Sequence, residues 1–215
     1  MKRAKKNYLT NKGDTRHKSK KPRGGCLVFL LIIILLLIIS PNLQRSVGKI
    51  FYPLDYWNEV STASEEYDID PYLVMAVMKT ESHFDANAHS SADACGLMQL
   101  MPDTAEWIIE QAEMNIDLED AIWEPGDNIR MGVWYLRWLA EDYYLGNWVA
   151  ALAAYNGGMQ NVDGWLKDGT WDGSFDDRDQ IPFKETAAYL EKIKKTYLRY
   201  YVIYAPQEKV AYELN

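Results

Sequence analysis

The first part of the chain changes abruptly from polar to apolar. Residues 1–23 are polar, and 14 consecutive apolar residues follow from Cys26 to Ile39. Residues 24–44 carry no charge, and these 21 residues would measure about 31 Å as a helix, close to the apolar thickness of a bilayer. We therefore expect one transmembrane helix over residues 24–44.

Beyond residue 44, apolar residues recur at helical spacing. Ile129, Val133 and Leu136, for example, lie three or four positions apart and predict one buried helix face. Caps and prolines predict helix starts at Asp70-Pro71, Pro102, Asp127, Asn147 and Pro182. The helix that starts at Asp70 is expected to end near Ser82, and the helix that starts at Asp127 near Gly146. The helix that starts at Asn147 should end near Ala154, and the helix that starts at Pro182 near Tyr204. Irregular structure is expected at residues 115–126 and 166–182. No useful stretch alternates apolar and polar residues as a strand would, so the sequence predicts an all-α fold.

The pattern also predicts the domain boundaries. A linker is expected at residues 45–55, one helical domain at 56–204 and a tail at 205–215. All eight tryptophans lie beyond residue 44, and the remaining 171 residues suffice for one domain with its own hydrophobic core.

Charge separates the same regions. The formal net charge of −8 combines +9 for residues 1–23, which hold ten basic side chains and one acid, with −17 for residues 45–215, which hold 13 basic and 30 acidic groups. A nucleic-acid interface on the folded part is disfavoured, because phosphate binding requires cations there. The positive-inside rule predicts a cytoplasmic basic tail and an extracytoplasmic domain.

A cleaved signal peptide is the alternative to a retained anchor. The basic region is 23 residues long, the apolar run ends in Ser40-Pro41 without a small-residue cleavage pattern, and Cys26 precedes the run instead of following it as in a lipoprotein. These features favour a retained signal-anchor in the cell membrane, with the cytoplasmic membrane as a partner.

Cysteine and histidine are too sparse for a disulfide framework or a metal site. The chain holds two cysteines, Cys26 and Cys95, and three histidines without ligand spacing. We expect no metal and no cofactor.

One carboxyl group stands out. Glu81 follows Leu73 and Val77 at four-residue spacing, so it ends an apolar stripe on the predicted helix. Partial desolvation would raise its pKa and suit it to general acid catalysis near neutral pH. The alternative is a solvated glutamate at a frayed helix end.

Several motifs in a fixed order add to this interpretation. They resemble the lytic transglycosylases of the soluble-lytic-transglycosylase type, glycoside hydrolase family 23, over about residues 56–204. The resemblance implies a goose-lysozyme-like helical fold. The matching segments are Glu81-Ser82-x-Phe84, Ser90, Gly96-Leu97-Met98-Gln99-Leu100-Met101-Pro102, Ala154-Tyr155-Asn156-Gly157-Gly158 and Ile181-Pro182-Phe183-x-Glu185-Thr186-x-x-Tyr189.

The resemblance implies that Glu81 is the sole catalytic carboxyl. It would protonate the glycosidic oxygen between N-acetylmuramic acid and N-acetylglucosamine in peptidoglycan glycan strands. It would then take the proton from the muramic C6 hydroxyl, which attacks C1 and leaves a 1,6-anhydro end. Two-carboxylate glycosidases need their second group as nucleophile or base, whereas here the sugar supplies the nucleophile.

The other motif residues receive supporting roles by resemblance. Ser90 and Gln99 would hydrogen-bond the substrate, Gly96 would allow close backbone approach, and Met101 would line the groove. Tyr155 would lie near Glu81, Asn156 would fix the helix end and groove wall, and Glu185 with Tyr189 would form the far side of the groove. Simpler interpretations remain open, namely a turn glycine for Gly96, a core residue for Met101 and a first-turn acid for Glu185.

The chain departs from the family pattern at Asp93, where a glycine is usual, so Asp93 must either avoid or tolerate a positive φ. Cys95 is expected to be a small buried side chain. Two rival functions stay open: a hydrolysing muramidase of the same fold, and a non-catalytic peptidoglycan-binding module of a wall-spanning assembly. Protein partners are not indicated.

Overall fold

The computed structural model describes residues 23–205, 212 and 214, so the basic tail and most of the C-terminal tail lie outside the described residues. The chain divides after Gln44 into two units, Met1–Gln44 and Arg45–Asn215. This division coincides with the end of the uncharged segment.

A second helix begins inside the uncharged segment, where one helix over residues 24–44 was expected, and it continues into the expected linker at 45–55. Helix α1 spans Arg23–Ile39 and α2 spans Pro41–Phe51, with Ser40 between them. Pro41 opens α2 at a position where a missing amide proton costs no hydrogen bond, and a proline disfavours helical geometry in the residue before it. In the part of the chain that the structure describes, no helix is long and apolar enough to cross a membrane.

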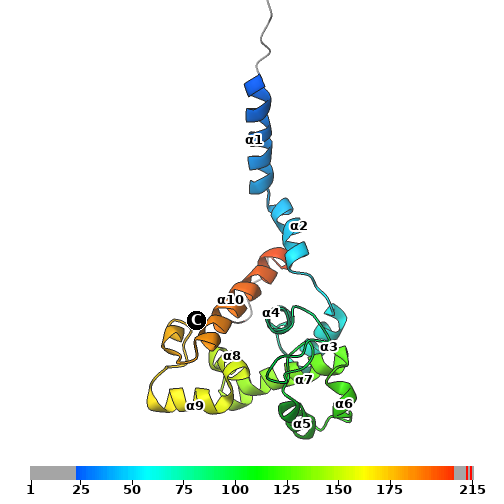
Figure 1. The fold of residues 1–215 in the computed structure, drawn as a ribbon, viewed down its shortest axis with the longest axis vertical. Helices are drawn as coiled ribbons and strands as arrows, with labels where there is room; N and C mark the ends of the chain where they lie inside the picture. Colours follow the sequence, from blue (N-terminus) through cyan, green and yellow to red (C-terminus); the bar gives the residue numbers. More distant parts are fainter. Residues whose placement is uncertain (1–22, 206–211, 213, 215) are drawn as a thin grey trace, which may run out of the picture. The chain divides into compact units, whose positions relative to one another are not determined.

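The second unit is helical throughout, as expected (Figure 1). Its described residues contain two isolated β-bridges, at His89–Cys95 and Cys95–Leu100, and no strand. Its elements are α3 (Trp57–Tyr67), α4 (Pro71–Glu81), α5 (Pro102–Gln111), α6 (Leu118–Ala121), α7 (Pro125–Arg137), the π-helix η1 (Trp138–Tyr143), α8 (Trp148–Gly157), α9 (Met159–Asp168), the 3₁₀ turn η2 (Arg178–Gln180) and α10 (Lys184–Tyr204).

Helix α4 lies at the centre of this unit, between α10 and α3 (Figure 1). Six consecutive residues, Leu73–Met78, are fully buried. The predicted cap is confirmed, because the Asp70 carboxylate accepts a hydrogen bond of 2.8 Å from the Tyr72 amide. The same carboxylate also accepts hydrogen bonds from the Tyr197 and Tyr201 hydroxyls of α10. The start of α4 is thereby joined to α10, which fixes where its other end, Glu81, emerges.

Three expectations about local structure were wrong. Glu124, not Asp127, caps α7: its carboxylate accepts from the Asp127 amide at 2.8 Å, because Pro125 takes the first helical position. The interval expected to be irregular at 115–126 contains α6 and the start of α7, and α9 extends to Asp168, inside the loop expected from residue 166. That loop also buries Trp171 completely.

Candidate active site

Glu81 is the last residue of α4, and its side chain is half-buried. Burial raises its pKa to about 7. The Tyr189 hydroxyl and the Lys192 ammonium oppose this shift, whereas the charge of Glu185 adds to it. The upward shift of the Glu81 pKa that the apolar stripe predicted is therefore found, and the alternative of a fully solvated glutamate does not hold.

Two tyrosines face this carboxyl from different helices. Tyr155 of α8 donates a hydrogen bond of 2.8 Å to the Met98 carbonyl. Tyr189 of α10 is buried, and its hydroxyl makes no hydrogen bond of normal geometry with the described residues. Burial, and then the charge of Glu81, raise the pKa of both phenols and keep them protonated. The Tyr189 hydroxyl is thus a donor beside the carboxyl and favours its ionised form.

The chain turns sharply after Glu81. Ser82 is buried, donates to the Leu97 carbonyl at 2.8 Å and accepts from the Phe84 amide. His83 and Phe84 both take positive φ values, 53° and 68°, which are costly for residues with a side chain. This turn directs the chain into the loop at residues 88–100, and Ser82 holds the two together.

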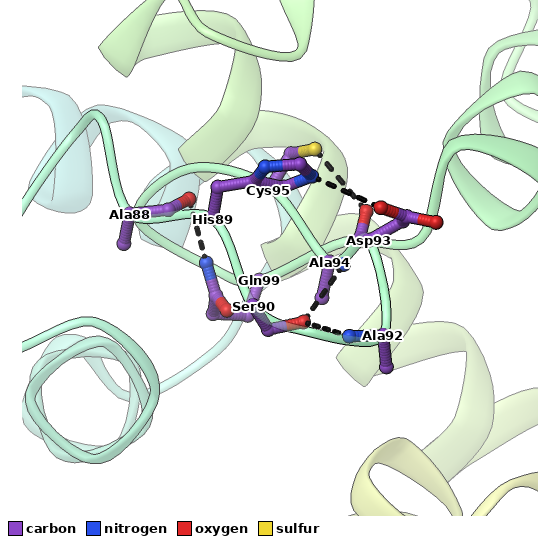
Figure 2. Close-up of polar contacts among 8 residues, drawn as sticks. All are labelled: Ala88, His89, Ser90, Ala92, Asp93, Ala94, Cys95 and Gln99. Atoms are coloured by element: carbon purple, nitrogen blue, oxygen red, sulfur yellow. Dashed lines mark hydrogen bonds and ion pairs between the residues drawn. The ribbon is translucent and has the colours of Figure 1, made fainter.

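The side chains expected to bind substrate are bonded to their own loop (Figure 2). The Ser90 hydroxyl oxygen accepts from the amides of Ala92 and Ala94. The Gln99 amide nitrogen donates to the carbonyls of Ala88 and Gly96, each at 3.0 Å. These bonds shape the loop, and a ligand of Gln99 would compete with them.

Asp93 tolerates the conformation for which the family uses glycine. Its φ is 67°, and aspartate is one of the residues that adopt this region more readily. Its carboxylate lies 3.3 Å from the His89 imidazole, and its carbonyl accepts from the Cys95 thiol (Figure 2). Cys95 is 4% exposed and burial raises its pKa, so it is the small buried side chain that was expected.

Asn128 is a residue that the sequence analysis missed. It lies in the first turn of α7 and is 1% exposed. Its carbonyl oxygen accepts from the Met98 amide at 2.8 Å, and its nitrogen donates to the carbonyls of Ile122 and Cys95. An asparagine beside a predicted helix start resembles a cap, and nothing in the local pattern indicated its contacts with the loop.

A glycine is required at position 96 because Asn128 and Ile122 pack directly against it, not because a substrate must approach it. Its φ is 74°, and an added Cβ would lie 2.5 Å from the Asn128 amide nitrogen and 2.8 Å from the Ile122 carbonyl oxygen. Close backbone approach is thus found, but toward the protein's own side chain. This makes the turn-glycine interpretation of Gly96 the better one.

We expect Gly96→Ala to lower the free energy of unfolding by about 3 kcal/mol, through backbone strain and the clash with Asn128. Gly169 is a matched control, because its φ is 75° and nothing lies within 4 Å of an added Cβ. Gly169→Ala should cost about 1 kcal/mol from strain alone. Urea unfolding of both variants measures the difference, and equal losses would contradict the role of Asn128.

The other expected residues border the same region. Met101 precedes α5 and is 42% exposed, so it is not a core residue. Asn156 of α8 accepts from the Thr186 hydroxyl at 2.9 Å and so joins α8 to α10. Glu185 is exposed in the first turn of α10. A cavity of about 350 Å³ is lined by Asn156, Gly157, Phe183, Lys184, Glu185 and Thr186.

Lys192 is a second residue that the sequence analysis missed. It lies three residues after Tyr189 on α10, and its ammonium donates to the Thr80 carbonyl in the last turn of α4 at 3.3 Å. Its charge favours the ionised form of Glu81, and it also lowers the pKa of Lys79 and His83. No group of His, Cys, Asp or Glu side chains within the described ranges could hold a metal ion.

Comparison with known proteins gives a consistent result. Residues 58–176, more than half of the chain, match the family model of the transglycosylase SLT domain. The membrane-bound lytic murein transglycosylase C of Edwardsiella ictaluri is 36% identical over 116 residues, covering 50% of this chain and 32% of that protein. The chain spans about a quarter to a third of the length of the curated relatives it matches.

Two solved structures are similar. A lytic transglycosylase Slt from Pseudomonas aeruginosa, solved as an inactive glutamate-to-glutamine mutant, has a TM-score of 0.67 and 31% identity over 74% of this chain and 26% of that one. The 70 kDa soluble lytic transglycosylase of Escherichia coli has a TM-score of 0.68 and 25% identity, with the same coverage. The lysozyme-like helical fold is thereby confirmed.

Proposed function

Because the chain belongs to the transglycosylase SLT domain family, we propose that it is a peptidoglycan lytic transglycosylase. It cleaves the β-1,4 bond between N-acetylmuramic acid and N-acetylglucosamine and leaves a 1,6-anhydro end. The position of Glu81, half-buried at the end of the apolar helix α4 with a raised pKa, carries this proposal. A carboxyl with a pKa of about 7 is partly protonated at neutral pH, so it can first donate and then accept a proton.

Glu81 acts in two steps. Its proton passes to the glycosidic oxygen as the bond from C1 to that oxygen breaks. The resulting carboxylate then takes the proton of the muramic C6 hydroxyl, which restores the acid. At the same time the C6 oxygen forms a bond to C1. In this scheme the Tyr189 hydroxyl donates a hydrogen bond to the carboxylate between these steps, which its influence on the pKa of Glu81 supports.

A second catalytic carboxylate is not needed in this scheme. Retaining and inverting glycosidases place a second carboxylate beside the scissile bond. Glu185, whose charge reaches Glu81, is exposed and better suited to contact a sugar hydroxyl. The internal C6 hydroxyl replaces the second group because it is already held next to C1.

The remaining site residues take binding or positioning roles in the proposal. We assign Ser90, Gln99 and Met101 to one side of the substrate groove and the exposed Glu185 to the other, with the buried Tyr189 behind it next to Glu81. Gly96, Tyr155 and Asn156 hold the loop and helix ends in place, as their packing and hydrogen bonds support.

Product analysis tests the proposed reaction. Purified peptidoglycan is digested with the full chain, and the soluble fragments are analysed by mass spectrometry. A 1,6-anhydro end is one water lighter than a reducing end. Reducing ends would instead show a hydrolysing muramidase, and undigested wall would show a non-catalytic binding module.

Activity should fall as pH rises through the neutral range, because the acid step needs protonated Glu81 and the pKa of Glu81 is about 7. Lys192→Met removes a positive charge that favours the ionised form, so this limb of the profile should move to higher pH. Lys195→Met is the control, because Lys195 is exposed on the same helix. Identical profiles for wild type and Lys192→Met would contradict the influence of Lys192 on Glu81.

Membrane anchoring through residues 24–44 is part of the proposal, with residues 1–23 in the cytoplasm and the catalytic domain outside. Four consecutive α1 residues, Val28–Leu31, are each at least 49% exposed, so α1 is apolar around its circumference. Such a helix suits a lipid environment. Resistance of the full chain to alkaline extraction from bacterial membranes, and digestion of its domain by external protease, test this topology.

A further inference from the structure

Helix α2 presents an apolar face that the rest of its unit does not cover. Val47, Ile50 and Phe51 are 44%, 76% and 64% exposed. These positions lie three and four residues apart and therefore share one side of the helix. Helix α2 is also the most amphipathic of the longer helices described. An exposed face of this kind needs an occupant.

The opposite side of α2 is fixed to the catalytic domain. Gly48 packs against Ile203 of α10 so closely that an added Cβ would lie 2.8 Å from that side chain. The Lys49 ammonium lies 5.5 Å from the centre of the Tyr204 ring, and the Tyr204 hydroxyl donates to the Tyr52 carbonyl at 2.7 Å. With these contacts in place, the apolar face points away from α10.

The charges of α2 differ from those of the domain that follows. Arg45 and Lys49 are the only charged residues between positions 24 and 54, and the first acidic residue after them is Asp55. The rest of the domain has a large excess of acidic groups. Within α2 itself the apolar face is thus accompanied by positive charge alone, and α2 follows the apolar segment directly in sequence.

We propose that α2 lies in the membrane surface, with Val47, Ile50 and Phe51 among the acyl chains and Arg45 at the headgroups of anionic phospholipids. A short helix with one apolar face and basic polar residues is the usual form of an interfacial helix. The inference rests on the proposed membrane anchoring. It adds that the catalytic domain is held at the bilayer in a set orientation, because Gly48 packs directly on α10.

A polarity-sensitive fluorophore at position 50 tests this. The full chain carries Ile50→Cys in a Cys26→Ser, Cys95→Ser background and is reconstituted into vesicles of phosphatidylcholine with phosphatidylglycerol. The control places the label at Leu145, which is 85% exposed in the same unit and outside α2. We expect a blue shift and quenching by brominated lipids at position 50, and neither at position 145.

Flotation and alkaline extraction of the same samples separate this inference from the anchoring. If the chain resists extraction while the label at position 50 resembles that at 145, the anchor stands and the interfacial helix is overturned. If alkaline treatment extracts the chain, but the label at position 50 was blue-shifted before extraction, the interfacial position of α2 is supported and the transmembrane anchor is overturned. A chain that does not float with vesicles overturns both.

A charge variant tests the lipid class. Arg45→Gln should remove much of the difference in blue shift between vesicles with and without phosphatidylglycerol. A shift that never depends on phosphatidylglycerol in the parent protein would overturn the anionic-lipid part of the proposal.

Discussion

Glu81→Gln is expected to lower the rate of peptidoglycan digestion by at least about 100-fold, the usual contribution of a general acid. Glutamine keeps the size of the side chain but has no proton to transfer to the glycosidic oxygen. Release of soluble fragments from purified peptidoglycan measures the loss, and far-UV circular dichroism checks the fold. Glu106→Gln, at an exposed site on α5, is the control. Digestion by Glu81→Gln at the control rate would disprove the mechanism.

The same variant should be more stable than the wild type at alkaline pH. The folded protein raises the pKa of Glu81 from 4.5 to about 7, so the wild type loses stability as pH rises between these values. The loss reaches up to about 3 kcal/mol above pH 7, because a tenfold change in a proton-binding constant corresponds to about 1.4 kcal/mol. Glutamine removes this loss, so urea unfolding at pH 8 should favour the variant, and unfolding near pH 4 should not. A variant no more stable at pH 8 would mean that Glu81 ionises without a burial penalty.

Asp70→Ala is expected to lower the free energy of unfolding by about 4 kcal/mol. The substitution removes the cap of α4 and leaves the buried hydroxyls of Tyr197 and Tyr201 without their acceptor. A cap contributes about 1 kcal/mol, and each hydrogen bond to a charged group contributes about 1.5 kcal/mol or more.

Asp176→Ala is the matched control, because Asp176 is exposed and should change stability by less than about 0.5 kcal/mol. Urea unfolding measures both variants. Tyr201→Phe should lower the free energy of unfolding less in the Asp70→Ala background than in the wild type, because Asp70→Ala has already removed the carboxylate to which the Tyr201 hydroxyl donates. Additive losses would mean that the two residues do not interact.

The sequence was sufficient where a feature is local. Asp70-Pro71 specifies a helix start through its own backbone, and the stripe that ends in Glu81 indicates burial through helical periodicity alone. The family motifs then placed Gln99, Tyr155 and Tyr189 around that carboxyl. The pKa shifts of Tyr155 and Tyr189 reflect the charge of Glu81, whereas Gln99 is bonded to its own loop, and the roles of all three with substrate stay predictions.

Features that depend on distant contacts could not be predicted in this way. Asn128 contacts Met98 across 30 residues of chain, and Lys192 reaches Thr80 across 112. Trp171 lies in a stretch rich in glycine and aspartate, yet it is fully buried. Its neighbours in sequence are polar, so only the assembled helices could show where it packs.

The hydrogen bonds of Asn128 have a consequence for the motions of the loop beside Glu81. The Met98 amide donates a hydrogen bond to the buried side chain of Asn128, and the same side chain donates one to the Cys95 carbonyl. The loop therefore cannot lift away from α7 without breaking these hydrogen bonds. The Met98 amide proton should exchange with solvent slowly, so under the proposed function this part of the loop is already formed before a glycan strand binds.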